Sequence, residues 1–367
     1  MKYNWQLPDW PNFNYDDSVI DGIVLSFALE TGEMKGLLDA LPDAVRQETI
    51  LEFMMAEAIK TSEIEGEFFS RQDIMSSLKK QLGIGGNLGH IKDRRSNGVA
   101  ELMVAVGTSY QRDFTESLLK RWHKILMKDY NHVSAGSYRK GEEPMQIVSG
   151  AVGREVVHFL APDSGQVSRE MKVFVKWYNE FRVNKDDIKR IFIKTAIAHL
   201  YFETIHPFED GNGRIGRAIA EKCLSESLGR PVLIGLSSTI EKERTKYYNA
   251  LKAAQRTLEI TEWIQYFSEV ILESQKSAKR IVLFTLNKVK FLDKHKPELN
   301  ERAFKAILKM FDMGTTGFEG GMTAKKYLSI NKTSRATATR DLQDLVSKKV
   351  LIQEGEGRSV RYLLNIN

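Results

Sequence analysis

One stretch of twelve residues combines a histidine, acidic residues, glycines and two arginines; it reads His206-Pro207-Phe208-Glu209-Asp210-Gly211-Asn212-Gly213-Arg214-Ile215-Gly216-Arg217. A histidine has a pKa suited to accepting a proton near neutral pH. An aspartate offers the hard oxygen ligand that Mg²⁺ prefers. The glycines permit backbone conformations that bring amide N–H groups together, and the arginines supply forked donors to phosphate. The combination favours phosphoryl or nucleotidyl transfer.

Two helices must hold this stretch in place. Apolar periodicity predicts a helix over residues 186–205, with Asp186 as its N-cap, and another that starts near Arg214 and ends before Pro231. Residues 210–213 interrupt the helical pattern between them. A glycine loop at a helix N-terminus forms a nest for phosphate oxygens. The interruption is therefore the expected anion-binding part of the site.

At each defined position the stretch matches the Fic motif, His-x-Phe-x-(Asp/Glu)-Gly-Asn-Gly-Arg-x-x-Arg, so the sequence resembles the Fic family. The resemblance implies an enzyme that transfers AMP from Mg-ATP to a serine, threonine or tyrosine hydroxyl of a protein, the chain itself included. It implies His206 as the catalytic base and Asp210 as the Mg²⁺ ligand. The implied ATP-binding set is Glu65, Val148, Ser149, Gly150, Ala151, His206, Asp210, Gly211, Asn212, Gly213, Arg214, Ile215, Gly216, Arg217 and Tyr247.

The same resemblance implies individual roles. Residues 211–213 would form the anion hole, Arg214 would help to hold the phosphates, and Arg217 would hold the γ-phosphate. Phe208 would point inward and anchor the loop, a role that its apolar character also favours. Tyr247 would line the adenine pocket, although a core position in an amphipathic helix fits it nearly as well.

Residues 144–162 break the helical pattern. The β-rich runs 145–148 and 156–159 flank Gly150 and Gly153, which predicts a hairpin. This hairpin resembles the flap of Fic proteins, which docks the target as an added strand.

A second motif lies upstream, in Thr61-Ser62-Glu63-Ile64-Glu65-Gly66. It matches the family's inhibitory motif, (Ser/Thr)-x-x-x-Glu-(Gly/Asn). Thr61 and Glu65 share a helix face, and Gly66 fits a helix cap. Taken alone, such a glutamate is more often simply solvated; beside a full Fic motif, the resemblance implies that Glu65 pairs with Arg217 and inhibits the enzyme. Removal of AMP, with Glu65 positioning a water molecule, remains an alternative.

The chain is predicted to be mainly α-helical: a Fic-type core with a hairpin flap, followed by a winged-helix domain. Further helices are predicted over 18–31, 42–64, 97–106, 115–127, 168–181, 240–255 and 260–286. The predicted divisions are an N-terminal helical region at 1–95 with the inhibitory motif at 61–66, the catalytic core at 96–286 with the flap at 144–162, a linker at 287–300 and the winged helix at 301–367.

The last segment has the pattern of a helix-turn-helix followed by a hairpin. Helices are predicted over 301–311, 324–329 and 335–347, and strands over 350–353 and 360–364. Residues 301–367 hold twelve Lys and Arg against seven Asp and Glu, which accounts for most of the net charge of +6. A DNA-binding regulator with a nucleotide-sensing core is therefore a further hypothesis. The basic cluster that motivates it is Lys325, Lys326, Lys332, Arg335 and Arg340; winged helices also bind proteins.

Composition excludes several other classes. Hydrophobic residues make up 42% of the chain and charged residues 28%, which is typical of a soluble globular protein. No apolar run approaches the roughly 18 residues of a membrane span, and the N-terminus lacks a signal core. The single cysteine, Cys223, is expected to be a buried thiol. We expect a cytoplasmic protein, and the resemblance implies a homodimer.

Overall fold

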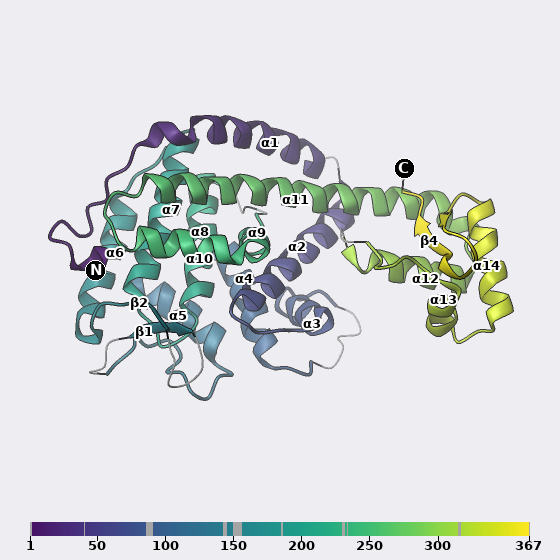
Figure 1. The fold of residues 1–367 in the computed structure, drawn as a ribbon, viewed down its shortest axis with the longest axis horizontal. Coiled ribbons are helices and arrows are strands. Elements are labelled where there is room, and N and C mark those ends of the chain that lie inside the picture. The colour runs from purple at the N-terminus through teal and green to yellow at the C-terminus, as the bar shows by residue number, and fades with distance from the viewer. Residues whose placement is uncertain are drawn as a thin grey trace. The chain divides into compact units, whose positions relative to one another are not determined.

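The computed structural model is built almost entirely of helices (Figure 1). It describes residues 2–39, 41–85, 91–141, 145–149, 156–184, 186–229, 232, 234–314 and 317–366. The chain divides into two compact units, the first of residues 1–33 and 50–278 and the second of residues 34–49 and 279–367. The predicted mainly α-helical class is confirmed, whereas the predicted domain boundaries stay predictions.

Three helices contribute residues to both units: α1 (Asp21–Asp39), α2 (Asp43–Ile64) and α11 (Thr261–His295). The other helices of the first unit are α3 (Arg71–Gln81), α4 (Arg95–Ser109), α5 (Glu116–Met127), α6 (Ser164–Glu180), α7 (Ile188–Ile205), α8 (Asn212–Ser227), α9 (Leu236–Lys242) and α10 (Arg244–Ala254). No helix in the described ranges is long and apolar enough to cross a membrane.

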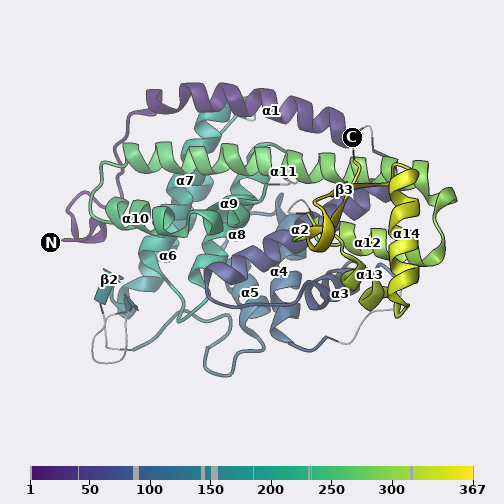
Figure 2. The same cartoon turned by 45° about the vertical axis from the view of Figure 1, so that its right-hand side comes forward.

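Helix α7 is the centre of the first unit. Every residue from Ile191 to Ile205 is buried, because this helix is apolar on nearly all sides. One face, with Phe202 and Ile205, packs into a hydrophobic cluster shared with α4 and α5. The opposite face, with Ile197 and Leu200, packs into a second cluster shared with α10 and α11. Figures 1 and 2 show α8 beside α7, so the loop that joins them is anchored in the core.

Helix α8 also contacts α4, α5 and α9. Its cysteine, Cys223, is fully buried, and burial raises the pKa of the thiol. The prediction of a buried structural thiol is therefore confirmed.

The predicted hairpin is present. Strand β1 (Gln146–Ser149) pairs antiparallel with β2 (Val156–Leu160), and the register shifts between Ile147 and Val148. The residues between the two strands lie outside the described ranges.

The second unit follows the predicted order of three helices and a hairpin. Its elements are α12 (Glu301–Phe311), α13 (Ala324–Asn331), α14 (Arg335–Ser347), β3 (Leu351–Glu354) and β4 (Arg361–Leu364). The side chains of Asn300, Thr323 and Ser334 each accept a backbone N–H from the first turn that follows them, which explains where the three helices begin. Tyr327 and Leu342 lie in the core of this unit.

Several predicted helix boundaries were wrong, and α6, predicted from residue 168, begins at Ser164. The predicted helix over 240–255 is two helices, α9 and α10, because the backbone leaves the helical region at Glu243. The helix predicted over 260–286 continues to His295: apolar residues such as Phe291 recur at helical spacing, and Pro297 is the first helix breaker. The predicted linker at 287–300 is therefore helical over its first nine residues. The N-cap of α7 is Asp187, which accepts the N–H of Arg190, rather than Asp186.

Helix α3 and the second half of α1 were not predicted from the sequence pattern. The signal for α3 was present, since Ser70 accepts the N–H of Asp73 and Ile74 and Leu78 form its buried stripe. Helix α1 continues past Thr31 to Asp39, and Gly32 and Gly36 lie within it. Glycine lowers helix propensity, but packing of residues such as Met34 outweighs that cost.

We expect Gly98→Ala to destabilise the first unit by about 1–3 kcal/mol, the usual cost of overpacking. A Cβ atom at Gly98 of α4 would lie 2.6 Å from the backbone oxygen of Leu126 and 2.8 Å from that of Ile125. Gly107→Ala on the same helix is the matched control, since nothing lies within 4 Å of its Cβ position. Urea unfolding of both variants checks this, and equal stability of the two would contradict the close crossing of α4 and α5.

Candidate active site

The catalytic-type histidine sits where α7 ends. His206 caps the helix in the left-handed backbone region, with φ 48° and ψ 61°, and its N–H donates to the Phe202 oxygen at 2.9 Å. Few non-glycine residues adopt this conformation, and it turns the chain sharply out of the helix. The His206 side chain is only 12% exposed, and its Nδ1 lies 3.8 Å from Oε2 of Glu203.

A single side chain closes the loop that follows. Asn212 Oδ1 accepts the N–H of Phe208 at 2.9 Å, and Asn212 Nδ2 donates to the Phe208 oxygen at 2.8 Å. Gly211, with φ 80°, is the N-cap of α8, and among the described residues no N-cap side chain accepts a hydrogen bond from the first turn. A helix N-terminus of this kind can bind an anion, and the anion hole at residues 211–213 stays a prediction.

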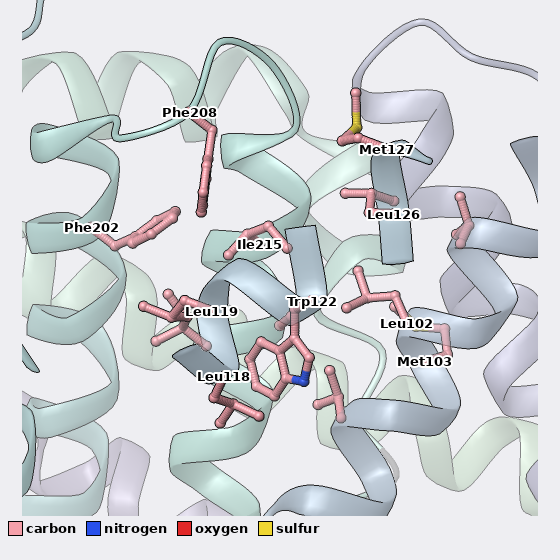
Figure 3. Packing of buried hydrophobic residues seen from close by; sticks show 14 of the residues in the cluster. Leu102, Met103, Leu118, Leu119, Trp122, Leu126, Met127, Phe202, Phe208 and Ile215 are labelled. Carbon is pink, nitrogen blue, oxygen red and sulfur yellow. The ribbon is translucent and has the colours of Figure 1, made fainter. Parts of the chain in front are cut away.

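The aromatic ring of Phe208 holds this loop in the core. Figure 3 shows it pointing inward from the loop toward Phe202 and Ile215. It stacks on the ring of His123, with centroids 3.9 Å apart and planes at 3°. Ile215, one of the predicted ATP-binding residues, is itself buried in this cluster.

His123, which the sequence analysis missed, is a support for the loop. Its Nε2 lies 3.0 Å from the backbone oxygen of Asp210, and its Nδ1 accepts the backbone N–H of Gly136 at 2.8 Å. Burial lowers the pKa of His123 to about 4, so the ring is neutral and donates from Nε2. Only its partner residues, distant in sequence, distinguish it from an ordinary core histidine.

The segment 61–66 contacts the second arginine of the motif directly. Arg217 is 3% exposed and donates from Nη2 to Glu65 Oε1 at 2.8 Å and to the Thr61 oxygen at 2.9 Å. Its Nε donates to Thr61 Oγ1 at 2.9 Å. A Cβ at Gly213 would lie 2.4 Å from Glu65 Oε1, so the carboxylate occupies the space over the loop. The helix α2 ends at Ile64, and Gly66 has φ 80° just beyond it.

A second carboxylate holds the first arginine. Arg214 Nη1 forms an ion pair with Glu67 Oε2 and bonds to Tyr130 Oη at 3.1 Å, and its side chain is 1% exposed. Tyr130 also donates to Glu67 at 2.7 Å, and Arg95 lies 3.6 Å from the same carboxylate. The sequence analysis missed Glu67, although the run Glu65-Gly66-Glu67 was a readable signal of two carboxylates on one turn.

Asp210 has a partly exposed carboxylate at the start of the loop. Its side chain is 46% exposed, with Oδ1 3.7 Å from Arg214 Nη2 and Oδ2 3.9 Å from His132 Nε2. In the described ranges, no three His, Cys, Asp or Glu side chains form a group that could hold a metal ion. One exposed carboxylate does fit Mg²⁺ bound mainly by phosphates and water.

Two titratable groups beside the loop are uncharged near neutral pH. Burial raises the pKa of Glu203 to about 8, against the positive charge of Arg217. Burial, then the charge of Arg139, lowers the pKa of His206 to about 4. Glu203 Oε1 has no partner in the described structure, and a Cβ at Gly216 would lie 2.1 Å from it. Gly216 therefore serves the close packing of α7 on α8.

The remaining predicted residues are less tightly grouped. Tyr247 is buried in the core between α7 and α11, where its hydroxyl lies 2.9 Å from His199 Nε2. Val148 and Ser149 end strand β1, whereas Gly150 and Ala151 lie outside the described residues.

Two family matches cover most of the first unit. Residues 3–84 match a domain of unknown function, DUF4172, and residues 113–224 match the Fic/DOC family. Residues 113–224, which contain this site, therefore form a Fic/DOC family domain. The Fic match contains the whole of α5, α6 and α7 and most of α8, including both arginines of the motif.

Curated relatives match part of the chain. A probable protein adenylyltransferase from Aquifex aeolicus is 33% identical over 142 residues, which are 38% of this chain and 37% of that protein. The protein adenylyltransferase Fic of Drosophila melanogaster is 23% identical over 52% of this chain and 35% of its own length. The match thus spans little more than a third of each relative.

Solved structures share the fold over a longer span. A Fic family protein from Desulfovibrio desulfuricans aligns over 96% of this chain and 98% of its own, with a TM-score of 0.54 and 18% identity. A Fic domain-containing signaling protein from Bacteroides thetaiotaomicron aligns over 70% of this chain and 96% of its own, with a TM-score of 0.52 and 20% identity.

We expect the wild type to lose stability as the pH rises above 6.5, and Glu203→Gln to abolish this loss. A raised carboxyl pKa contributes stability that is complete below the unfolded value of about 4.5 and is lost as pH rises through about 8. Between pH 6.5 and 8 the wild type should lose about 1–2 kcal/mol more unfolding free energy than the variant. Urea unfolding at the two pH values measures the difference, and parallel losses would show that Glu203 is not protonated in the folded protein.

Proposed function

We propose that this protein is a protein adenylyltransferase, which moves AMP from Mg-ATP to a serine, threonine or tyrosine hydroxyl of a protein, the chain itself included. The supporting observation is the grouping at the α7–α8 junction of a neutral histidine, an uncapped helix N-terminus and two arginines. The relatives named as protein adenylyltransferases cover this same region.

In the proposed reaction, His206 takes the proton of the target hydroxyl. The hydroxyl oxygen attacks the α-phosphorus, the bond from that phosphorus to the bridging oxygen breaks, and pyrophosphate leaves. Because Nδ1 of His206 is buried beside Glu203, Nε2 is the nitrogen that meets the hydroxyl. The first amides of α8 would bind phosphate oxygens, and the guanidinium groups of Arg214 and Arg217 would balance their charge.

Asp210 is the proposed magnesium ligand, because its partly exposed carboxylate supplies the hard oxygen that Mg²⁺ prefers. The ion would neutralise charge on the phosphates. The target would dock as an added strand on the β1–β2 hairpin, and the enzyme would act as a homodimer.

Glu65 is the proposed inhibitor of this activity. Its carboxylate takes a donor of Arg217 that the γ-phosphate needs and lies over Gly213, where phosphates would approach. Glu67 occupies Arg214 in the same way. The competing proposal, removal of AMP with Glu65 positioning a water, uses the same carboxylate as an active group.

We expect Glu65→Gly to raise the rate of AMP labelling. A hydrogen bond to a charged group is worth about 1.5–3 kcal/mol, so freeing Arg217 corresponds to a gain of roughly tenfold to a hundredfold. Labelling with ATP carrying an α-³²P atom measures it. Glu63→Gly is the matched control, since Glu63 pairs with Lys60 at 2.6 Å on the same helix and not with Arg217. Adding His206→Ala to Glu65→Gly should lower labelling by about 10²–10⁴.

Two outcomes would overturn parts of the proposal. Flat or reduced labelling by Glu65→Gly, when the wild type is measurably active, excludes inhibition by Glu65 and favours AMP removal. Full labelling by the double variant with His206→Ala excludes His206 as the base.

A second candidate function, binding of DNA, rests on the second unit. Exposed basic side chains flank the turn between α13 and α14, namely Lys325, Lys332, Arg335 and Arg340. Gln343 is exposed on α14 as well. Arginine can form paired hydrogen bonds to guanine, and glutamine can form them to adenine.

We expect a DNA duplex to bind the full chain with an affinity that falls steeply with salt. The charge reversals Arg335→Glu and Arg340→Glu together should abolish this binding. The matched control reverses two exposed lysines of α6, Lys172→Glu and Lys176→Glu, and should leave it unchanged. Fluorescence anisotropy from 50 to 300 mM salt provides the measurement. Absence of binding at low salt would leave protein contacts as the role of this unit.

A further inference from the structure

Arg139 joins three parts of the active-site region. Its Nε donates to the His206 oxygen at 2.8 Å, and its backbone N–H donates to the Pro207 oxygen at 2.9 Å. Its Nη1 donates to Ser164 Oγ at 3.0 Å, at the start of α6. Its Nη2 donates to the Pro162 oxygen, just beyond strand β2, and lies 3.4 Å from the Ile205 oxygen.

The acceptors of Arg139 are unusual for a buried cation. The residue is 4% exposed, and among the partners that the described structure gives its guanidinium there is no carboxylate. Burial lowers the pKa of Arg139 to about 10, which still leaves the group charged near neutral pH. The oxygens of Ile205 and His206 lie at the C-terminus of α7, where the helix dipole is negative. A buried charge is tolerated here because several oriented carbonyl groups replace water.

We propose that Arg139 is a positioning residue for His206, which fixes the left-handed backbone of the histidine and ties it to the exit of the flap. Four hydrogen bonds from one planar group define where the histidine stands relative to Pro162, so a shift of the flap is transmitted to the base. Its part in the transfer reaction rests on the proposed function; the contacts themselves do not.

Arg139 also affects the charge of the histidine. Besides burial, the charges of Arg139, Glu65 and Asp210 act on His206, and the buried, protonated Glu203 lies beside its Nδ1. The Arg139 guanidinium disfavours imidazolium, whereas the carboxylates of Glu65 and Asp210 favour it. Loss of the positive charge at Arg139 should therefore raise the pKa of His206, and a purely mechanical support would not have this effect.

Two substitutions separate geometry from charge. Arg139→Gln removes the positive charge, whereas Arg139→Lys keeps the charge but lacks the forked guanidinium donors. Titration of the His206 ring by NMR in the full-length protein, assigned with His206→Ala, should show the pKa rising by about one unit in Arg139→Gln. It should change little in Arg139→Lys. Arg190→Gln is the matched control, since Arg190 also donates to a main-chain oxygen, that of Arg182, but at the surface.

Labelling measurements in the Glu65→Gly background test the positioning role. Arg139→Lys should lower kcat by roughly 10–10² while KM for ATP stays within about twofold, because the base is displaced and the phosphate site is not. The melting temperature of each variant identifies loss of folding.

The outcomes are distinguishable. An unchanged His206 pKa in a folded Arg139→Gln protein, or an unchanged kcat in folded Arg139→Lys, would overturn the proposal. If neither variant folds, Ser164→Ala, which removes the acceptor of Nη1, still decides: kcat in the Glu65→Gly background should fall, and an unchanged kcat would overturn the proposal. Absence of labelling in Glu65→Gly would refute the transferase, whereas the NMR titration would still report on Arg139.

Discussion

The paired hydrogen bonds between Asn212 and Phe208 are the contact on which the active-site region depends. They close the chain between α7 and α8 into a small ring, so that the histidine at one helix end and the amides at the next helix start face a common space. Phe208 anchors this ring in the hydrophobic core, because its aromatic side chain stacks on His123. Asn212 thus holds the backbone of the loop, and Phe208 holds the loop through its own ring.

Local signals in the sequence predicted the elements well where capping and periodicity agree. Helices α2, α12 and α14 begin at the predicted residues or next to them, because Asp43, Asn300 and Ser334 mark their starts chemically. Boundaries failed where packing outweighed local preference, as in α11 beyond Leu286. The motif predicted the α7–α8 junction because all its members lie within twelve residues.

The supports of the site could not be predicted in this way. Glu67 lies 147 residues from Arg214, and Arg139 lies 67 residues from His206. A lone glutamate or arginine carries no mark of such a partner, since most lie on the surface. Similarly, the loss of charge at Glu203 depends on how closely α7 packs on Gly216, which only the three-dimensional structure reveals.

The negative charge of the segment from Glu65 to Glu67 has a further consequence for ligand binding. Its two carboxylates pair with the two buried guanidinium groups of the Fic motif, so each of these arginines already has a negative partner. Any ligand that enters has to replace the negative charge it displaces, since an unpaired buried arginine is costly. The site therefore selects its ligands by charge before it selects them by shape. An uncharged nucleoside cannot form ion pairs with the two arginines, whereas a polyphosphate can.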